Sequence, residues 1–225
     1  MANYISSNSN RFYAAVESAY GQAGSVTSSN RFPAVRLAVQ QGLEQGKRHD
    51  KTGSRTFLGV PANTRRLTAV EVRTYLTSWS TPGQGNYGPL FQAALGATPS
   101  FNSGITVAAS ITSTTIQTAN PHGLATGSGV SYGNDIRFVT AVNDATTFTI
   151  NAPFTAVPSA GALLAPTVTY KLASKLPSLT LYDYWDPATA VQRAAVGVGI
   201  SQFAISINGD FHEFLFRGPA ADVVD

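Results

Sequence analysis

Glycines spaced as in a dinucleotide-binding loop are the first feature that could carry chemistry. The segment Gly83-Gln-Gly-Asn-Tyr-Gly88 matches the pattern GxGxxG, in which a glycine-rich turn lets a pyrophosphate approach a helix N-terminus. Its context is wrong for that role, because Pro82 and Pro89 flank it and no acid that could bind a ribose occurs before Asp135. We therefore expect a flexible turn and no bound cofactor.

The histidines do not have the spacing of metal ligands. His49, His122 and His212 are scattered along the chain, and only His212 lies next to a carboxylate, that of Glu213. Consecutive residues of a strand point to opposite faces, so this pair cannot hold a metal or act as an acid–base couple. We expect no metal site.

Two carboxylates around an aromatic pair are the remaining candidate for chemistry. Asp183 and Asp186 bracket Tyr184-Trp185, an arrangement that could serve glycoside chemistry or sugar binding. The simpler interpretation is the end of a strand followed by a solvated turn before Pro187. GxSxG, HExxH and P-loop patterns do not occur. The sequence therefore predicts a protein that is not an enzyme.

The composition favours a protein that associates with copies of itself. Charged residues make up 12% of the 225 residues, about half of the usual ~25%. A surface with so few charges is easiest to understand if other copies cover it. The chain has no cysteine, no apolar run of the ~18 residues that a membrane span needs, and no signal-like N-terminus, so we expect no membrane insertion.

The charges are divided unevenly along the chain. Residues 1–80 carry ten basic and four acidic side chains, a balance of +6, whereas residues 81–225 carry five basic and eight acidic ones, a balance of −3. Halves of opposite sign suit head-to-tail stacking of identical subunits. A basic stripe over 47–55 and 65–66 also fits nucleic-acid phosphates, although no interleaved aromatic residues accompany it.

Strand patterns dominate the rest of the sequence. Val35–Val39 alternates and is broken by Gly42, Leu67–Trp79 is the longest alternating stretch, and Asn208-Gly209 is a strong hairpin signal. Pro89–Leu95 predicts a short helix that begins at a proline and ends at Gly96. Further strands are expected at 105–108, 115–118, 129–132, 137–142, 147–151, 167–172, 178–184, 190–200, 202–207 and 211–217.

Several segments, in this order, resemble the tail tube proteins of long-tailed, siphovirus-like bacteriophages. They are Ser6–Phe12 through Gly21, Asn30–Pro33, Asp50–Phe57, Tyr75–Trp79 and Phe203–Asp225. The resemblance implies an antiparallel β-sandwich or barrel with one short flanking helix. It also implies a virion protein whose hexameric rings stack into a tube that conducts DNA at ejection.

The same resemblance implies the protein's partners and location. The chain would assemble with itself and with the tape measure, tail terminator and distal tail proteins, in the host bacterial cytoplasm and then in the virion, and genomic DNA would pass it without specific binding. Pairing with neighbouring copies would also remove the exposed edges of long strands.

Residues 104–164 have a different composition, rich in Thr, Ser and Ala, and interrupt the tube-like segments 1–103 and 165–225. Thr118–Gly127 and Ile136–Ile150 resemble a small β module of phage structural proteins. In its first turn Pro121 sets the entry, Gly123 allows tight backbone, Leu124 anchors the turn, and His122 stabilises it. We expect a small all-β insert on the outside of the tube.

A DNA conduit should not attract DNA, yet this chain is basic overall. We therefore expect the loop residues Lys47, Arg48, Asp50, Lys51 and Arg55 at the contact between rings. Other functions stay open. The chain could be a tail terminator, a head–tail connector or a capsid decoration protein, or, from a different class, a carbohydrate-binding adhesin module.

Overall fold

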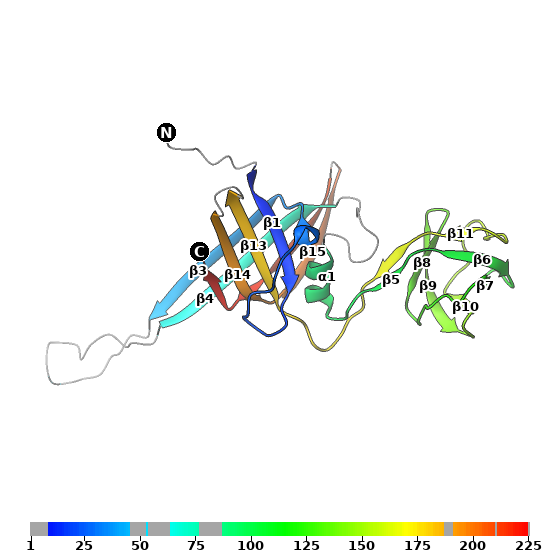
Figure 1. Ribbon diagram of the computed structural model, residues 1–225, viewed down its shortest axis with the longest axis horizontal. Coiled ribbons are helices and arrows are strands. Elements are labelled where there is room, and N and C mark those ends of the chain that lie inside the picture. Colours follow the sequence, from blue (N-terminus) through cyan, green and yellow to red (C-terminus); the bar gives the residue numbers. More distant parts are fainter. Residues whose placement is uncertain are drawn as a thin grey trace. The chain divides into compact units, whose positions relative to one another are not determined.

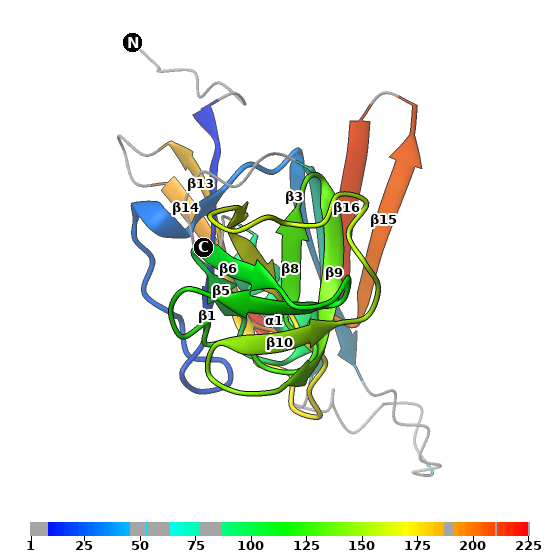
Figure 2. The same cartoon turned by 90° about the vertical axis from the view of Figure 1, so that its right-hand side faces the viewer.

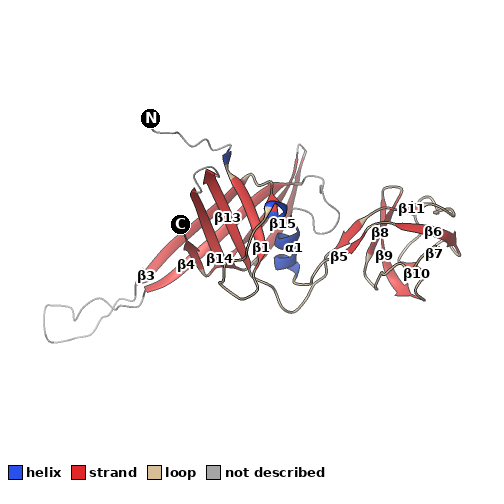
Figure 3. Ribbon diagram, in the orientation of Figure 1, coloured by secondary structure: helices blue, strands red, loops and turns tan. Residues whose placement is uncertain are grey.

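The computed structural model describes residues 9–45, 53, 64–76, 87–186, 191–209 and 211–224. The fold is mainly β, as the predominance of strands in Figure 3 shows, and 54% of the described residues are in strands and 7% are helical. Its sheets are antiparallel, and α1 (Gly88–Leu95) is the α-helix of the described residues. This confirms the predicted fold class.

The chain forms two compact units. The first comprises Met1–Ser78, Pro89–Gly96 and Ser174–Asp225, and the second comprises Trp79–Gly88 and Ala97–Ala173. The second unit is continuous from Ala97, so it extends beyond the range 104–164 that the change in composition suggests. Each unit has its own sheets.

The first unit contains a five-stranded and a four-stranded sheet (Figure 1). The five-stranded sheet has the order β17 (Asp222–Val224), β14 (Val191–Val198), β13 (Leu179–Asp186), β1 (Arg11–Val16) and β2 (Arg31–Phe32), and the short 3-10 helix η2 (Ser28–Asn30) precedes β2. The four-stranded sheet has the order β15 (Gln202–Asn208), β16 (Phe211–Ala220), β4 (Thr64–Tyr75) and β3 (Arg36–Gln45).

The strand β3 is longer than its sequence pattern suggests. The alternation ends near Gly42, but β3 pairs with β4 without interruption from Arg36 opposite Arg73 to Gln45 opposite Thr64. The ladder of main-chain hydrogen bonds to β4 outweighs the weak strand preference of one glycine. The predicted hairpin is confirmed, because β15 and β16 pair up to Asn208 opposite Phe211.

The core of the first unit lies on one face of the four-stranded sheet. Along β4, Val70 and Val72 are buried, whereas the alternate residues are more exposed. The ring of Phe91 in α1 lies 5.3 to 5.6 Å, edge to face, from the rings of Phe203, Phe214 and Phe216. Among the described residues of the first unit, the opposite face of the four-stranded sheet is more exposed, with Ala69, Glu71 and Arg73 on it, and is called the uncovered face.

The second unit is built around a six-stranded sheet that nearly closes on itself. A bridge between Ser131 and Ala165 joins its two ends. Its core contains Val107, Ile116 and Phe148. The strand order is β11 (Leu163–Leu164), β6 (Ile105–Ser110), β7 (Thr115–Thr118), β10 (Thr147–Ile150), β9 (Asp135–Val142) and β8 (Gly129–Tyr132), and β5 (Ser100–Asn102) pairs separately with β12 (Thr167–Thr169).

Candidate assembly surface

The four-stranded sheet ends in two edge strands, β15 and β3. In the part of the chain that the structure describes, no strand pairs with the outer side of either one, and Figure 2 shows β15 beside β16 with no strand beyond it. Such edges expose rows of backbone N–H and C=O groups that can pair with another chain. Because β3 and β15 differ in sequence, pairing between them is heterologous, which builds a ring or an open filament.

The hairpin formed by β15 and β16 exposes large apolar side chains near its tip. Ile205 is 53% exposed, Ile207 75% and Phe211 65%. On the adjacent strand, the ring of Tyr75 lies 5.3 Å from the ring of Phe211. In the register of the strands, Ile205 and Ile207 lie on the face of Phe214, whereas Phe211 and Tyr75 lie on the opposite face, that of Glu213. Exposed apolar residues on both faces beside an unpaired edge are typical of a surface that another protein covers.

The uncovered face of the four-stranded sheet carries paired charges. Glu71 of β4 accepts hydrogen bonds from Arg73 Nε at 2.7 Å and from Arg217 Nε at 2.7 Å. Glu213 lies 3.7 Å from Arg73 Nη1. The hydrogen bond from Arg73 is the main cause that lowers the pKa of Glu71, and Arg217 adds to it, so the carboxylate stays ionised.

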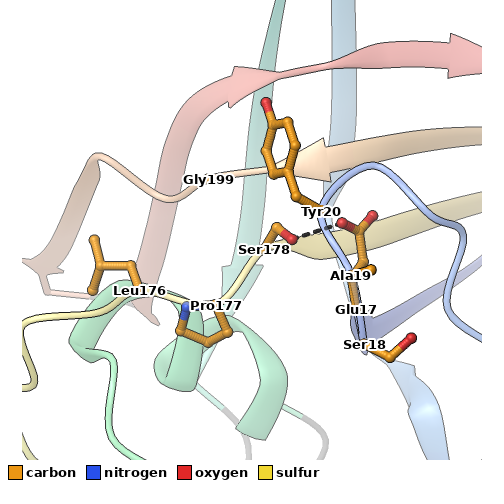
Figure 4. Close-up of a pocket in the computed structure, with 8 residues that line it drawn as sticks. All are labelled: Glu17, Ser18, Ala19, Tyr20, Leu176, Pro177, Ser178 and Gly199. Atoms are coloured by element: carbon orange, nitrogen blue, oxygen red, sulfur yellow. Dashed lines mark hydrogen bonds between the residues drawn. The ribbon is translucent and has the colours of Figure 1, made fainter.

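A buried carboxylate, Glu17, holds the end of the five-stranded sheet together. Its Oε2 accepts hydrogen bonds from Ser178 Oγ at 2.7 Å, drawn in Figure 4, and from Gly21 N–H at 2.9 Å. Its Oε1 accepts from Thr180 Oγ1 and Gly197 N–H, both at 2.8 Å. Burial raises the pKa of Glu17, but the four hydrogen bonds together lower it below its ordinary value. Both oxygens are fully engaged, although Glu17 and Ser178 border a pocket of about 340 Å³.

Asp183 is buried near the end of β13, which ends at Asp186 as expected, and the turn expected before Pro187 lies outside the described residues. Asp183 lies within β13 and is 8% exposed, because odd-numbered residues of this strand point into the core. Its Oδ2 accepts a hydrogen bond from Trp185 Nε1 at 2.7 Å, and its Oδ1 has no partner among the described residues. Burial raises the pKa of Asp183, against the opposing effects of Trp185 and Arg193. The side chain of Asp186 lies outside the described residues.

The turn predicted at the start of the insert is held by His122. Its Nδ1 accepts a hydrogen bond from Leu124 N–H at 2.9 Å, and its Nε2 lies 3.2 Å from the carbonyl oxygen of Asp144. The ring also contacts Phe148 edge to face at 5.2 Å. Gly123 has a φ of 61°, which favours glycine, and Pro121 is exposed at the entry. Nδ1 must be unprotonated to accept, so Nε2 carries the hydrogen.

Other predicted features lie wholly or partly outside the described residues. The residues expected at the ring contact, Lys47, Arg48, Asp50, Lys51 and Arg55, all lie outside them, as do His49 and most of the segment 83–88. His212 and Glu213 lie on β16, where consecutive side chains point to opposite faces. Among the described residues, no three His, Asp or Glu side chains gather as metal ligands would.

Comparisons with known proteins add no assignment. No protein-family model matches the sequence, and no curated protein is similar to it. Within the described parts of the chain, no helix has the length and apolar character needed to cross a membrane.

Sequence reasoning expected exposed strand edges, but it missed the hydrogen-bond partners of Glu17 and which strands form the edges of the four-stranded sheet among the described residues. Glu17 is a single acid, and three of its partners, Ser178, Thr180 and Gly197, lie more than 150 residues away along the chain. No local pattern signals such a cluster. An edge is likewise a property of the strand order, and a strand has the same local sequence pattern wherever it lies in a sheet.

Proposed function

We propose that this protein is a structural virion protein, the subunit of the tail tube of a long-tailed bacteriophage. The observation that carries the proposal is the four-stranded sheet, whose two different edge strands, β3 and β15, have no outer partner among the residues that the structure describes. Edge pairing between neighbouring copies closes such sheets into a ring, and an uneven charge distribution along the chain suits the stacking of rings.

The exposed apolar residues of the β15–β16 hairpin support the same assembly. Ile205 and Ile207 belong to the edge strand itself, so a neighbouring copy that pairs with β15 also covers them. The low charge content of the chain fits a surface that is largely buried between copies. In this proposal the second unit lies on the outside of the tube, because the lumen must remain open for DNA.

Electron microscopy of the purified protein, together with analytical ultracentrifugation, tests the proposal. We expect rings that stack into tubes. Isolated rings that never stack would favour a terminator or connector, and monomers that bind glycans would favour an adhesin module. Either result would overturn the tube assignment.

A charged residue on the edge strand gives a sharper test. Ile207→Lys places a charge on a side chain that is already 75% exposed, so the fold should be kept while ring formation is lost. The matched control is Ile111→Lys, which changes a side chain that is 57% exposed in the second unit. Assembly of the Ile207→Lys variant at wild-type concentrations would exclude β15 from the interface.

A further inference from the structure

Three arginines lie along one groove on the uncovered face of the four-stranded sheet. Arg36, Arg73 and Arg217 line this groove, whose volume is about 700 Å³, together with the small residues Ala38 and Ala69. Guanidinium groups spaced along a shallow surface are the usual means of holding a phosphate backbone. The groove has the shape and the cations of a polyanion site.

Glu71 occupies the hydrogen-bonding groups that such a site would need. Its Oε1 accepts from Arg73 Nε at 2.7 Å, and its Oε2 accepts from Arg217 Nε at 2.7 Å and lies 2.7 Å from Arg217 Nη2. The side chain of Glu71 is 22% exposed, whereas those of Arg73 and Arg217 are 41% and 43% exposed. One carboxylate thus fixes two guanidinium groups against the sheet.

We propose that Glu71 prevents DNA from binding to this face of the sheet. By pairing with Arg73 and Arg217, its carboxylate keeps their guanidinium groups from binding the phosphates of double-stranded DNA that passes over the face. This inference rests on the proposed function, in which the ring turns one face of the four-stranded sheet toward the DNA. Behind the groove, on the opposite face of the sheet, Val70, Val72 and Phe216 are buried. The face that bears Glu71 is therefore the one available. The arginines can then pair with Glu71 across neighbouring strands while this face of the sheet does not bind DNA.

The test is the Glu71→Gln variant of the full chain, measured against a fluorescent 20-base-pair duplex. Anisotropy is recorded at protein concentrations where ultracentrifugation shows single copies, so the result does not depend on ring formation. The wild type should bind no more tightly than about 100 µM at physiological salt, the weak limit of non-specific binding. At low salt, Glu71→Gln should bind the duplex at least about tenfold more tightly than the wild type does at the same salt. The slope of the logarithm of its binding constant against the logarithm of the salt concentration should steepen by about 2, because two arginines become available for phosphates.

Two further variants separate local pairing from net charge. Glu213→Gln makes the same charge change on the same face, but Glu213 has one distant contact of 3.7 Å with Arg73, so its effect should be much smaller. The triple variant Glu71→Gln, Arg73→Gln, Arg217→Gln should return to the weak binding of the wild type. Thermal unfolding of each variant verifies that it is folded.

Three results would overturn the inference: tight binding by the wild type, equal effects of Glu71→Gln and Glu213→Gln, or no gain in Glu71→Gln. Failure of the proposed function has a different signature, since it is read from the absence of tubes by electron microscopy. If Glu71→Gln binds DNA while the wild type forms no tubes, the pairing of Glu71 stands as a property of this face and the tail tube assignment falls.

Discussion

Replacing Glu17 by glutamine tests whether one carboxylate holds the end of the five-stranded sheet together. Glutamine has the same shape but replaces one oxygen with an NH₂ group. If the NH₂ group replaces Oε2, the N–H of Gly21 faces another donor, and if it replaces Oε1, the N–H of Gly197 does. The hydroxyl on the same side, from Ser178 or Thr180, can rotate to accept instead.

The expected loss of stability follows from these contacts. One buried backbone donor without an acceptor costs about 1–3 kcal/mol, and the two remaining hydrogen bonds lose the strength that a charged acceptor gives them. The expected loss of stability is about 3 kcal/mol for Glu17→Gln. It is about 4 kcal/mol for Glu17→Ala, which leaves both backbone donors without an acceptor. For a chain of this length, 3 kcal/mol lowers Tm by roughly 6–12 °C.

Urea unfolding followed by tryptophan fluorescence measures this loss, because Trp185 lies on β13 in the same sheet. The control is Glu44→Gln, which removes an exposed carboxylate of β3 and should change the free energy of unfolding by less than about 0.5 kcal/mol. A change as small as this for Glu17→Gln would refute the idea that the carboxylate joins these strands.

The pH dependence gives an independent measurement of the same group. The pKa of Glu17 in the folded protein lies below the ordinary 4.5, so its ionised form contributes stability that is fully present above pH 4.5. That contribution is lost as the pH falls through the folded pKa. The difference in stability between wild type and Glu17→Gln should therefore be constant near neutral pH and shrink in acid.

Two other substitutions have definite expected outcomes in thermal unfolding. Gly218→Ala places a Cβ 1.7 Å from the carbonyl oxygen of Gly199, so the backbone must move. The free energy of unfolding should fall by about 3 kcal/mol or more, with a lower Tm. The control is Gly42→Ala, whose Cβ would be 3.9 Å from its nearest neighbour and which should leave Tm unchanged. His122→Ala removes the acceptor of a turn N–H and should cost the second unit about 1–2 kcal/mol, whereas His122→Asn keeps an acceptor near the position of Nδ1 and should recover part of the loss.

The parts of the fold that were predicted correctly depend on local patterns. The alternation over 67–79 marks β4, and the proline and glycine at the ends of the segment 89–95 mark α1, where the φ of Gly96 is 99°. The short strands of the second unit are separated by turn residues, so β7 and β8 fall where the sequence predicts them. These signals depend only on neighbours along the chain.

Other elements lack such local signals. The strand β1 contains two buried alanines, Ala14 and Ala15, in place of large β-branched residues, and the sequence does not mark it as a strand. Its ladder with β13 pairs residues that are far apart in the chain, such as Phe12 and Asp183. The same packing buries Asp183, because the neighbouring strands rather than its own polarity decide its exposure.

By itself, the sequence determined that this is a mainly β protein with few charges, one short helix and a compositionally distinct β-rich segment, since alternation, turn residues and caps act over a few residues. Only the tertiary structure decided which strands became edges and which arginines met Glu71. It also decided which donors surrounded Glu17 and which glycine lay against backbone. Those outcomes depend on the order of strands in the sheets, which contacts between distant parts of the chain select, and the candidate assembly surface consists of such outcomes.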